Sequence, residues 1–112
     1  RINAEDPYKF VPSPGRINLW HAPGGPGVRG DSHAYTHYFV PPNYDSMIGK
    51  LITHGDTREQ ALARMRTALS EMVVEGINTN IALHRELLVD AKFVEGGTNI
   101  HYLERWLGQH KR

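Results

Sequence analysis

The sequence predicts an α+β fold, in which a small antiparallel β-sheet or barrel-sandwich-like half is followed by about three helices. All seven prolines lie within the first 42 residues. They separate short runs of β-branched and aromatic side chains, which is typical of antiparallel strands joined by turns. From Asp56 onward, apolar residues recur every three or four positions, which is the spacing of an amphipathic helix. A chain of 112 residues fits one domain.

Four strands are expected in the first half, at residues 1–5, 15–21, 34–40 and 46–54. The first strand alternates polar and apolar side chains, and Asp6-Pro7 ends it because proline has no N–H for a strand ladder. A strand that opens at residue 1 is expected to follow something else, so we expect the chain to be a fragment of a longer protein.

The first helix is expected to begin near Asp56 and to end at Gly76. Two alternative capping boxes stand at its start, Asp56 with Glu59 and Thr57 with Gln60. Arg64 and Arg66 lie off its apolar stripe, so we expect alanine there to change stability little. The stripe should pack against the sheet and consists of Ala61, Leu62, Met65, Ala68, Leu69, Met72 and Val73.

Two shorter helices should follow the first. We expect one over residues 78–89 and one from Thr98 or Asn99 to Leu107. Gly108 is expected to end the last helix, and the polar tail 108–112 is expected to be frayed.

Composition excludes several classes of function. The formal net charge is +1, which favours neither nucleic acid nor an anionic membrane as a partner. The chain has no cysteine, so disulfides and thiolate chemistry are excluded. No apolar run approaches the roughly 18 residues that span a bilayer. We therefore expect a cytoplasmic protein with no nucleic-acid or membrane partner.

Three short patterns lack the context that their usual function needs. RGD (29–31) matches an adhesion tripeptide by chance, and the glycines of 24–30 follow no strand-to-helix pattern. His33 and His37 would lie roughly 13 Å apart on a strand, too far to share a metal ion. No metal site is expected.

Two polar stretches next to expected strands are more informative. RINAEDP (1–7) begins with Arg1, which either belongs to a site or forms a surface ion pair with Glu5. In PPNYD (41–45), two prolines fix the chain immediately before three polar residues. This stretch is either a positioned polar loop or a tight corner with an Asx turn at Asn43 or Asp45.

Six segments occur together in the order and spacing of one known family. They are RINAEDP, F-x-P-S-P-G-R-I (10–17), HAPGG-x-GVR (21–29), VPP-x-YDSMIGKLI (40–52), GINTN (76–80) and GGTNIHYLE (96–104). They resemble the carboxyl-terminal domain of biotin carboxylase, the ATP-dependent component of acetyl-CoA carboxylase. The similarity covers essentially the whole chain, so residues 1–112 are expected to be this one domain, without the ATP-grasp part.

The resemblance implies an ATP-dependent ligase. In the family, ATP activates bicarbonate, and the carboxyl group passes to N1 of biotin on a carrier protein, for malonyl-CoA and fatty acid synthesis. The sites for ATP and for Mg²⁺ or Mn²⁺ lie before this segment, so no cofactor-binding residue is expected in it and the isolated segment should be inactive. The implied partners are the biotin carboxyl carrier protein, carboxyltransferase subunits and a second copy of the chain.

The resemblance also implies roles for particular residues. Arg1 corresponds to the arginine that faces the ureido oxygen of biotin, where a guanidinium can stabilise the charge that develops when N1 loses its proton. Asp45 is expected to orient Arg1. Tyr44 and Lys50 receive no role. The histidines at positions 21, 54, 84 and 101 are expected to be surface or packing residues.

Arg29 and Glu71 are the expected dimer-interface residues. The arginine that closes GG-x-GVR lies at the dimer interface of bacterial biotin carboxylases. The family commonly has an aromatic residue at the x position, where this chain has Pro26. Loss of a large apolar anchor weakens the expected dimer.

Two other functions stay open at this stage. The chain could be a non-catalytic dimerisation or interaction module, since it contains none of the family's nucleotide ligands. It could also be the same domain of another biotin-dependent enzyme, acting on pyruvate, propionyl-CoA or methylcrotonyl-CoA, or of urea amidolyase.

Overall fold

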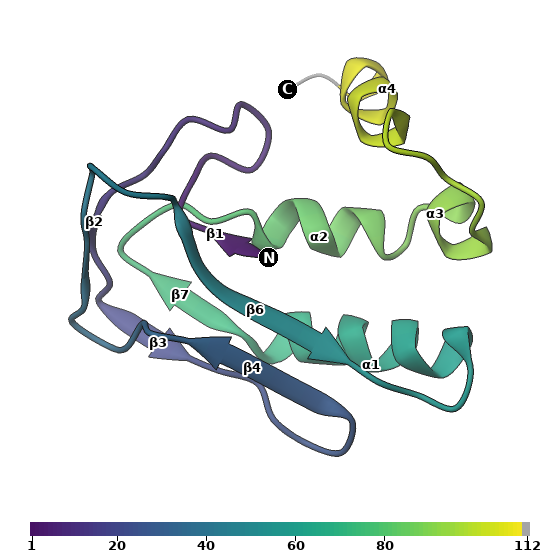
Figure 1. Ribbon diagram of the computed structural model, residues 1–112, viewed down its shortest axis with the longest axis horizontal. Coiled ribbons are helices and arrows are strands. Elements are labelled where there is room, and N and C mark those ends of the chain that lie inside the picture. The colour runs from purple at the N-terminus through teal and green to yellow at the C-terminus, as the bar shows by residue number, and fades with distance from the viewer. Residues whose placement is uncertain (111–112) are drawn as a thin grey trace.

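The computed structural model describes residues 1–110 and confirms an α+β fold, in which short antiparallel strands precede and flank four helices (Figure 1). The strands are β1 (Ile2–Asn3), β2 (Gly15–Arg16), β3 (Leu19–His21), β4 (Val28–Ser32), β5 (Phe39–Val40), β6 (Met47–Thr53) and β7 (Val73–Glu75). The helices are α1 (Arg58–Glu71), α2 (Ile81–Leu87), α3 (Ala91–Glu95) and α4 (Tyr102–Gln109).

The longest strand, β6, organises the largest sheet. It pairs antiparallel with β1 on one edge and β4 on the other, giving the order β1-β6-β4. Two further antiparallel pairs, β2 with β5 and β3 with β7, complete the β half. The first residues of the chain thus lie in the middle of the molecule, between β6 and α2 (Figure 1).

Helix α1 begins and ends at specific side chains. The hydroxyl of Thr57 accepts from the N–H of Gln60, so the second of the two expected capping boxes supplies the N-cap. At the other end, the Arg85 guanidinium of α2 donates two hydrogen bonds to the Leu69 carbonyl. A cation there complements the negative end of the helix dipole and ties α1 to α2.

Two strands form where the sequence did not indicate them. The glycine-rich run expected to be a turn contains β4, and the first helix was expected to reach Gly76 although β7 forms there instead. Gly76 has a φ of 104°, and a Cβ on it would lie 2.4 Å from the carbonyl oxygen of Arg16. Gly76 therefore ends β7, where it passes close to the backbone of the neighbouring segment.

Other expected boundaries were also wrong. The strand expected over 34–40 is reduced to β5, because a turn at residues 36 and 37 with a positive φ at His37 interrupts the extended chain. Helix α3 was not expected, and α4 continues through Gly108 to Gln109. Of the tail expected to be frayed, positions 111 and 112 lie outside the described residues.

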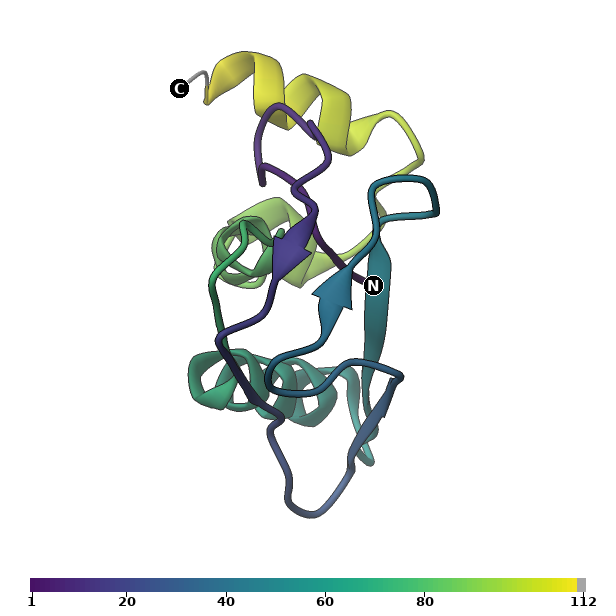
Figure 2. The same ribbon diagram turned by 90° about the vertical axis from the view of Figure 1, so that its left-hand side faces the viewer.

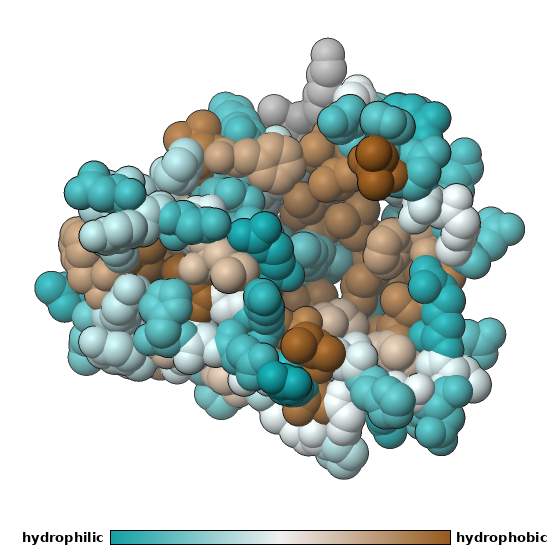
Figure 3. Space-filling view, viewed as in Figure 1, coloured by the Kyte–Doolittle hydropathy of each residue, from teal (hydrophilic) through white to brown (hydrophobic). Residues whose placement is uncertain are grey.

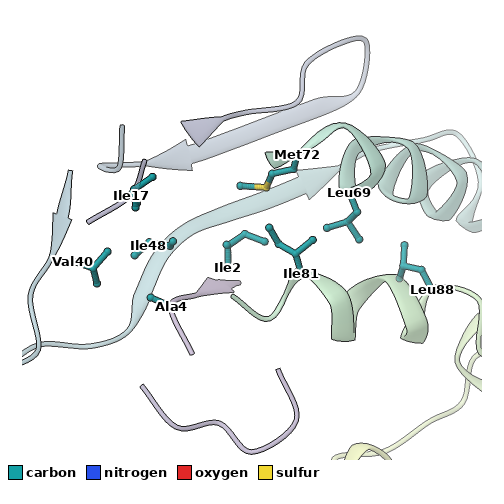
Figure 4. Close-up of a cluster of buried hydrophobic side chains, with 9 residues drawn as sticks. All are labelled: Ile2, Ala4, Ile17, Val40, Ile48, Leu69, Met72, Ile81 and Leu88. Atoms are coloured by element: carbon teal, nitrogen blue, oxygen red, sulfur yellow. The ribbon is translucent and has the colours of Figure 1, made fainter. Parts of the chain in front are cut away.

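The core lies between the sheet and the first two helices. Strand residues and helix residues contribute to it equally, as Figure 4 shows for Ile2 and Ile48 facing Leu69 and Ile81. Leu69, on the predicted apolar stripe, is 2% exposed. The full buried cluster is Ile2, Ala4, Ile17, Val40, Ile48, Leu69, Met72, Ile81 and Leu88.

The helices are stacked, with α2 between α1 and α4 (Figures 1 and 2). Helix α4 has one buried residue, Trp106, and α3 has none. Both are joined to the end of α2 by the Asp90 carboxylate, which accepts from the Tyr102 hydroxyl, the Trp106 indole N–H and the Phe93 N–H. Within residues 1–110, no helix is both long and apolar enough to span a bilayer.

Candidate functional site

Arg1 and Asp45 meet at the surface although they are far apart in the sequence. A guanidinium nitrogen of Arg1 lies 3.4 Å from Oδ2 of Asp45. The side chains are 58% and 70% exposed, so the Arg1 guanidinium remains accessible from solvent. An exposed pair of this kind contributes little to stability, roughly 0–1 kcal/mol, and mainly limits where the guanidinium can lie.

The Asp45 carboxylate has a second contact. Its Oδ1 accepts a hydrogen bond from the N–H of Met47 at 2.9 Å, which is an Asx turn at the start of β6. The two interpretations of PPNYD were alternatives in the sequence, but the structure contains both. The turn fixes the carboxylate, and the carboxylate's other oxygen faces Arg1.

Glu5, the alternative partner of Arg1, binds other groups. Its carboxylate accepts from the side-chain amide of Asn3 at 3.1 Å and from the hydroxyl of Ser46 at 3.3 Å. These bonds link β1 to the loop before β6, close to Asp45. The Oδ1 atom of Asn3 is buried and has no hydrogen-bond partner among the described residues.

The backbone of Arg1 is held by α2. The carbonyl oxygen of Arg1 accepts from Nδ2 of Asn80 at 3.1 Å and lies 2.7 Å from Nε2 of His84. Asn80 is buried and also exchanges two hydrogen bonds with the backbone of Asn3. Sequence reasoning assigned neither side chain to the site. GINTN contained Asn80, but the contact spans 79 residues and has no local signal.

His84 was expected to be a surface or packing residue, and the structure makes it a hydrogen-bonding partner of Arg1. Burial lowers the pKa of its imidazole below the ordinary value, while the hydrogen bond to the Arg1 carbonyl acts in the opposite direction. The ring is therefore neutral near pH 7 and has one N–H. Because a carbonyl oxygen only accepts, this N–H lies on Nε2.

The site opens on a hollowed face. Figure 3 shows apolar side chains gathered in a hollow over α2 and surrounded by polar ones. A cavity of about 120 Å³ lies beneath Arg1, between the sheet and the first two helices. It is lined by Arg1, Ile2, Leu51, Met65, Leu69, His84 and Leu88.

Arg29 and Glu71, the expected interface residues, lie on another part of the molecule. Arg29 is on β4, at the opposite edge of the sheet from β1, and pairs locally with Asp31 at 2.9 Å. Glu71, the last residue of α1, lines an open groove together with Pro26 and Val28. Within residues 1–110, no ion pair joins Arg29 to Glu71.

Comparison with known proteins defines the class to which this arrangement belongs. Residues 1–105 match the biotin carboxylase C-terminal domain family. The chain therefore belongs to that family.

Individual relatives agree with this assignment. Biotin carboxylase of Pseudomonas aeruginosa is 62% identical over 111 residues, which are 99% of this chain and 25% of that protein. The biotin carboxylase domain dimer of Hydrogenobacter thermophilus 2-oxoglutarate carboxylase, solved with MgADP and bicarbonate, has a TM-score of 0.93 and 39% identity over 100% of this chain and 25% of that chain. The biotin carboxylase subunit of a pyruvate carboxylase has a TM-score of 0.94 and 40% identity over 100% and 25%. The chain thus spans about a quarter of the length of these relatives.

Proposed function

We propose that this chain is the C-terminal domain of an ATP-dependent biotin carboxylase, and that Arg1 faces the biotin that becomes carboxylated. The observation that carries the proposal is an accessible guanidinium whose side chain is paired with Asp45 and whose backbone is hydrogen-bonded by α2. The family assignment supplies the reaction class.

Arg1 has the chemistry that this reaction needs. Removal of the N1 proton from biotin places negative charge on the ureido oxygen, and a positioned donor lowers the energy of that anion. A guanidinium is always charged and offers N–H donors in a fixed plane, which suits an oxyanion better than a lysine ammonium. Asp45 restricts the guanidinium from one side and leaves its other N–H groups for biotin.

The proposal extends to a complete enzyme. ATP and its Mg²⁺ or Mn²⁺ would be bound by the ATP-grasp part of that enzyme, and biotin would arrive on a carrier protein. The Hydrogenobacter thermophilus relative was solved with MgADP and bicarbonate, which supports this division of work. We further propose a cytoplasmic location, since the reaction needs ATP and bicarbonate.

We propose acetyl-CoA as the final acceptor, which would make the chain part of malonyl-CoA and fatty acid synthesis. The 62% identity to the Pseudomonas aeruginosa biotin carboxylase, compared with 40% to the biotin carboxylase subunit of pyruvate carboxylase, supports this choice. The test is to supply carrier protein with the carboxyltransferase of either pathway. Formation of oxaloacetate and not malonyl-CoA would refute the choice.

We also propose that the domain dimerises through a surface that includes Arg29 and Glu71. The domain of the Hydrogenobacter thermophilus relative is a dimer, and both side chains are exposed here. Arg29→Glu is expected to weaken the dimer in sedimentation without unfolding the protein, because one exposed charge contributes little to the core. Lys92→Glu, on the distant helix α3, is the matched control. An unchanged dimer in Arg29→Glu would remove Arg29 from the interface.

The central test uses a chimera in which this chain replaces the matching quarter of the Pseudomonas aeruginosa enzyme. We expect the chimera to carboxylate carrier-protein biotin with ATP and bicarbonate. Arg1→Gln should lower that rate by about 10²-fold, the scale for loss of one oxyanion donor. ATP affinity, measured by calorimetry, should not change.

Asp45→Asn should impair the same step less, since it loosens Arg1 without removing it. The double variant Arg1→Gln/Asp45→Asn should be no worse than Arg1→Gln alone, because the two residues act together. Full additivity would refute their pairing. A parallel loss of ATP affinity in Arg1→Gln would refute the biotin-facing role.

A further inference from the structure

We propose that Asn80 and His84 of the α2 segment are positioning residues, which fix the backbone of Arg1 so that its guanidinium is held at two points. This inference rests on the proposed function, because it assumes that Arg1 acts on biotin. Neither residue touches the guanidinium. Both act through the Arg1 carbonyl and, for Asn80, through the adjoining residue Asn3.

Asn80 takes the place of a neighbouring strand. Its N–H donates to the Asn3 carbonyl at 3.2 Å, and its Oδ1 accepts from the Asn3 N–H at 2.9 Å. This reciprocal pair resembles the bonding of two opposed strand residues. Because β6 occupies the other edge of β1, Asn80 leaves this short strand bonded along both edges.

The third bond of Asn80 reaches the site residue itself. Its Nδ2 donates to the Arg1 carbonyl at 3.1 Å. At 5% exposure, Asn80 is the buried polar residue of the described chain, and its amide N–H, Oδ1 and Nδ2 are all used. A buried polar side chain is expensive unless it is satisfied in this way, so its contacts define one geometry for the start of β1.

His84 completes the coordination of the same carbonyl. Its Nε2 lies 2.7 Å from the Arg1 oxygen, so this oxygen accepts from two side chains one turn apart on α2. A carbonyl oxygen has two lone pairs, and here both are occupied. The Arg1 peptide therefore has little freedom to rotate.

Fixing the backbone matters because the other restraint is weak. The contact with Asp45 is 3.4 Å long and exposed, and an arginine side chain has many rotamers to lose. If the peptide were free as well, the guanidinium would sample many positions relative to biotin. Displacement of a catalytic group by about 1 Å can cost 10²-fold in rate.

The test compares His84→Leu with His84→Gln in the chimera described above. Leucine removes the donor and keeps an apolar side chain of similar size, so the carboxylation rate of biotin should fall about tenfold with unchanged ATP affinity. Glutamine keeps an N–H donor and should restore most of the rate. His21→Leu, at an exposed position on β3, is the control and should leave the rate unchanged.

Two further variants keep the outcome decisive. Asn80→Asp retains the acceptor for the Asn3 N–H but cannot donate to the Arg1 carbonyl, and it should show the same selective loss if His84→Leu fails to fold. In the Arg1→Gln background, His84→Leu should have no additional effect on the rate.

The outcomes separate this inference from the proposed function. A normal rate in Arg1→Gln would overturn both. A defective Arg1→Gln with a normal His84→Leu would overturn only the positioning role. Additive losses in the double variant, no rescue by glutamine, or a parallel loss of ATP affinity would also overturn it, because His84 would then act through something other than Arg1.

Discussion

Asn80 and Asp90 stand at the two ends of α2, and each ties a different segment to it. Asn80 is buried and neutral, and binds the backbone of β1 and Arg1. Asp90 is less buried and charged, and binds the side chains of Tyr102 and Trp106 on α4. The first connection therefore orders the site strand, while the second holds the last two helices.

The difference in chemistry has a physical consequence. An amide does not titrate, so the contacts of Asn80 do not depend on pH. The Asp90 carboxylate is different, because the hydrogen bond from Tyr102, followed by those from Phe93 and Trp106, keeps its pKa below the ordinary value. We expect the site strand to stay in place under acidic conditions that loosen α4.

The largest effect is expected for Leu69, which lies in the core shared by both regions. Leu69→Ala should lower the free energy of unfolding by about 2–5 kcal/mol, the range for removing a buried leucine side chain. Denaturant unfolding of the 112-residue chain measures this change. Thr67→Ala, on the exposed side of α1, is the control and should stay within about 0.5 kcal/mol. Similar losses in both variants would mean that α1 is rotated relative to this structure.

Asn80→Ala should have the next largest effect, roughly 2–4 kcal/mol, because it leaves the buried backbone groups of β1 without partners. Amide hydrogen exchange should quicken at Asn3, whose N–H loses its acceptor. Exchange in residues 102–109 should not change. Faster exchange at both places would show that the two connections are not independent.

How far these features follow from the sequence depends on the range of the interactions involved. Helix α1 was predictable, since the Thr57 cap and the apolar stripe are local patterns. Strand β7 was not, because Val73 also fits a continuing helical stripe, and pairing with β3 decides its conformation. Strand β4 was hidden by its glycine and charged residues, which an edge strand beside β6 tolerates.

The candidate site divides in the same way. The proline-braced loop marked Asp45 as a positioned residue, and the family resemblance marked Arg1. Neither source indicated Asn80 or His84, whose contacts with Arg1 span 79 and 83 residues. Such contacts depend on how β1 enters the fold, which no local pattern records.

Asp90→Asn should have a smaller effect than Asn80→Ala and should act at the other end of α2. A carboxyl group whose folded pKa is lowered stabilises the fold above its unfolded pKa, and this contribution disappears as the pH falls through the folded value. The difference in stability between the wild type and Asp90→Asn should therefore shrink below roughly pH 4. Denaturant unfolding between pH 6 and 2 tests this, and a difference independent of pH would contradict it.

The smallest effect is expected for Arg66, which lies off the apolar stripe of α1. Sequence reasoning expected almost no cost for alanine there. The structure shows a hydrogen bond of 2.9 Å from its guanidinium to the Leu88 carbonyl, near the C-terminal end of α2. A partly buried bond of this kind contributes about 0.5–1.5 kcal/mol, so Arg66→Ala should cost that amount and thus more than Thr67→Ala. Because the bond joins α1 to α2 between Asn80 and Asp90, exchange should quicken at the end of α2 while Asn3 stays protected. A loss equal to that of Leu69→Ala would mean that Arg66 supports the core itself.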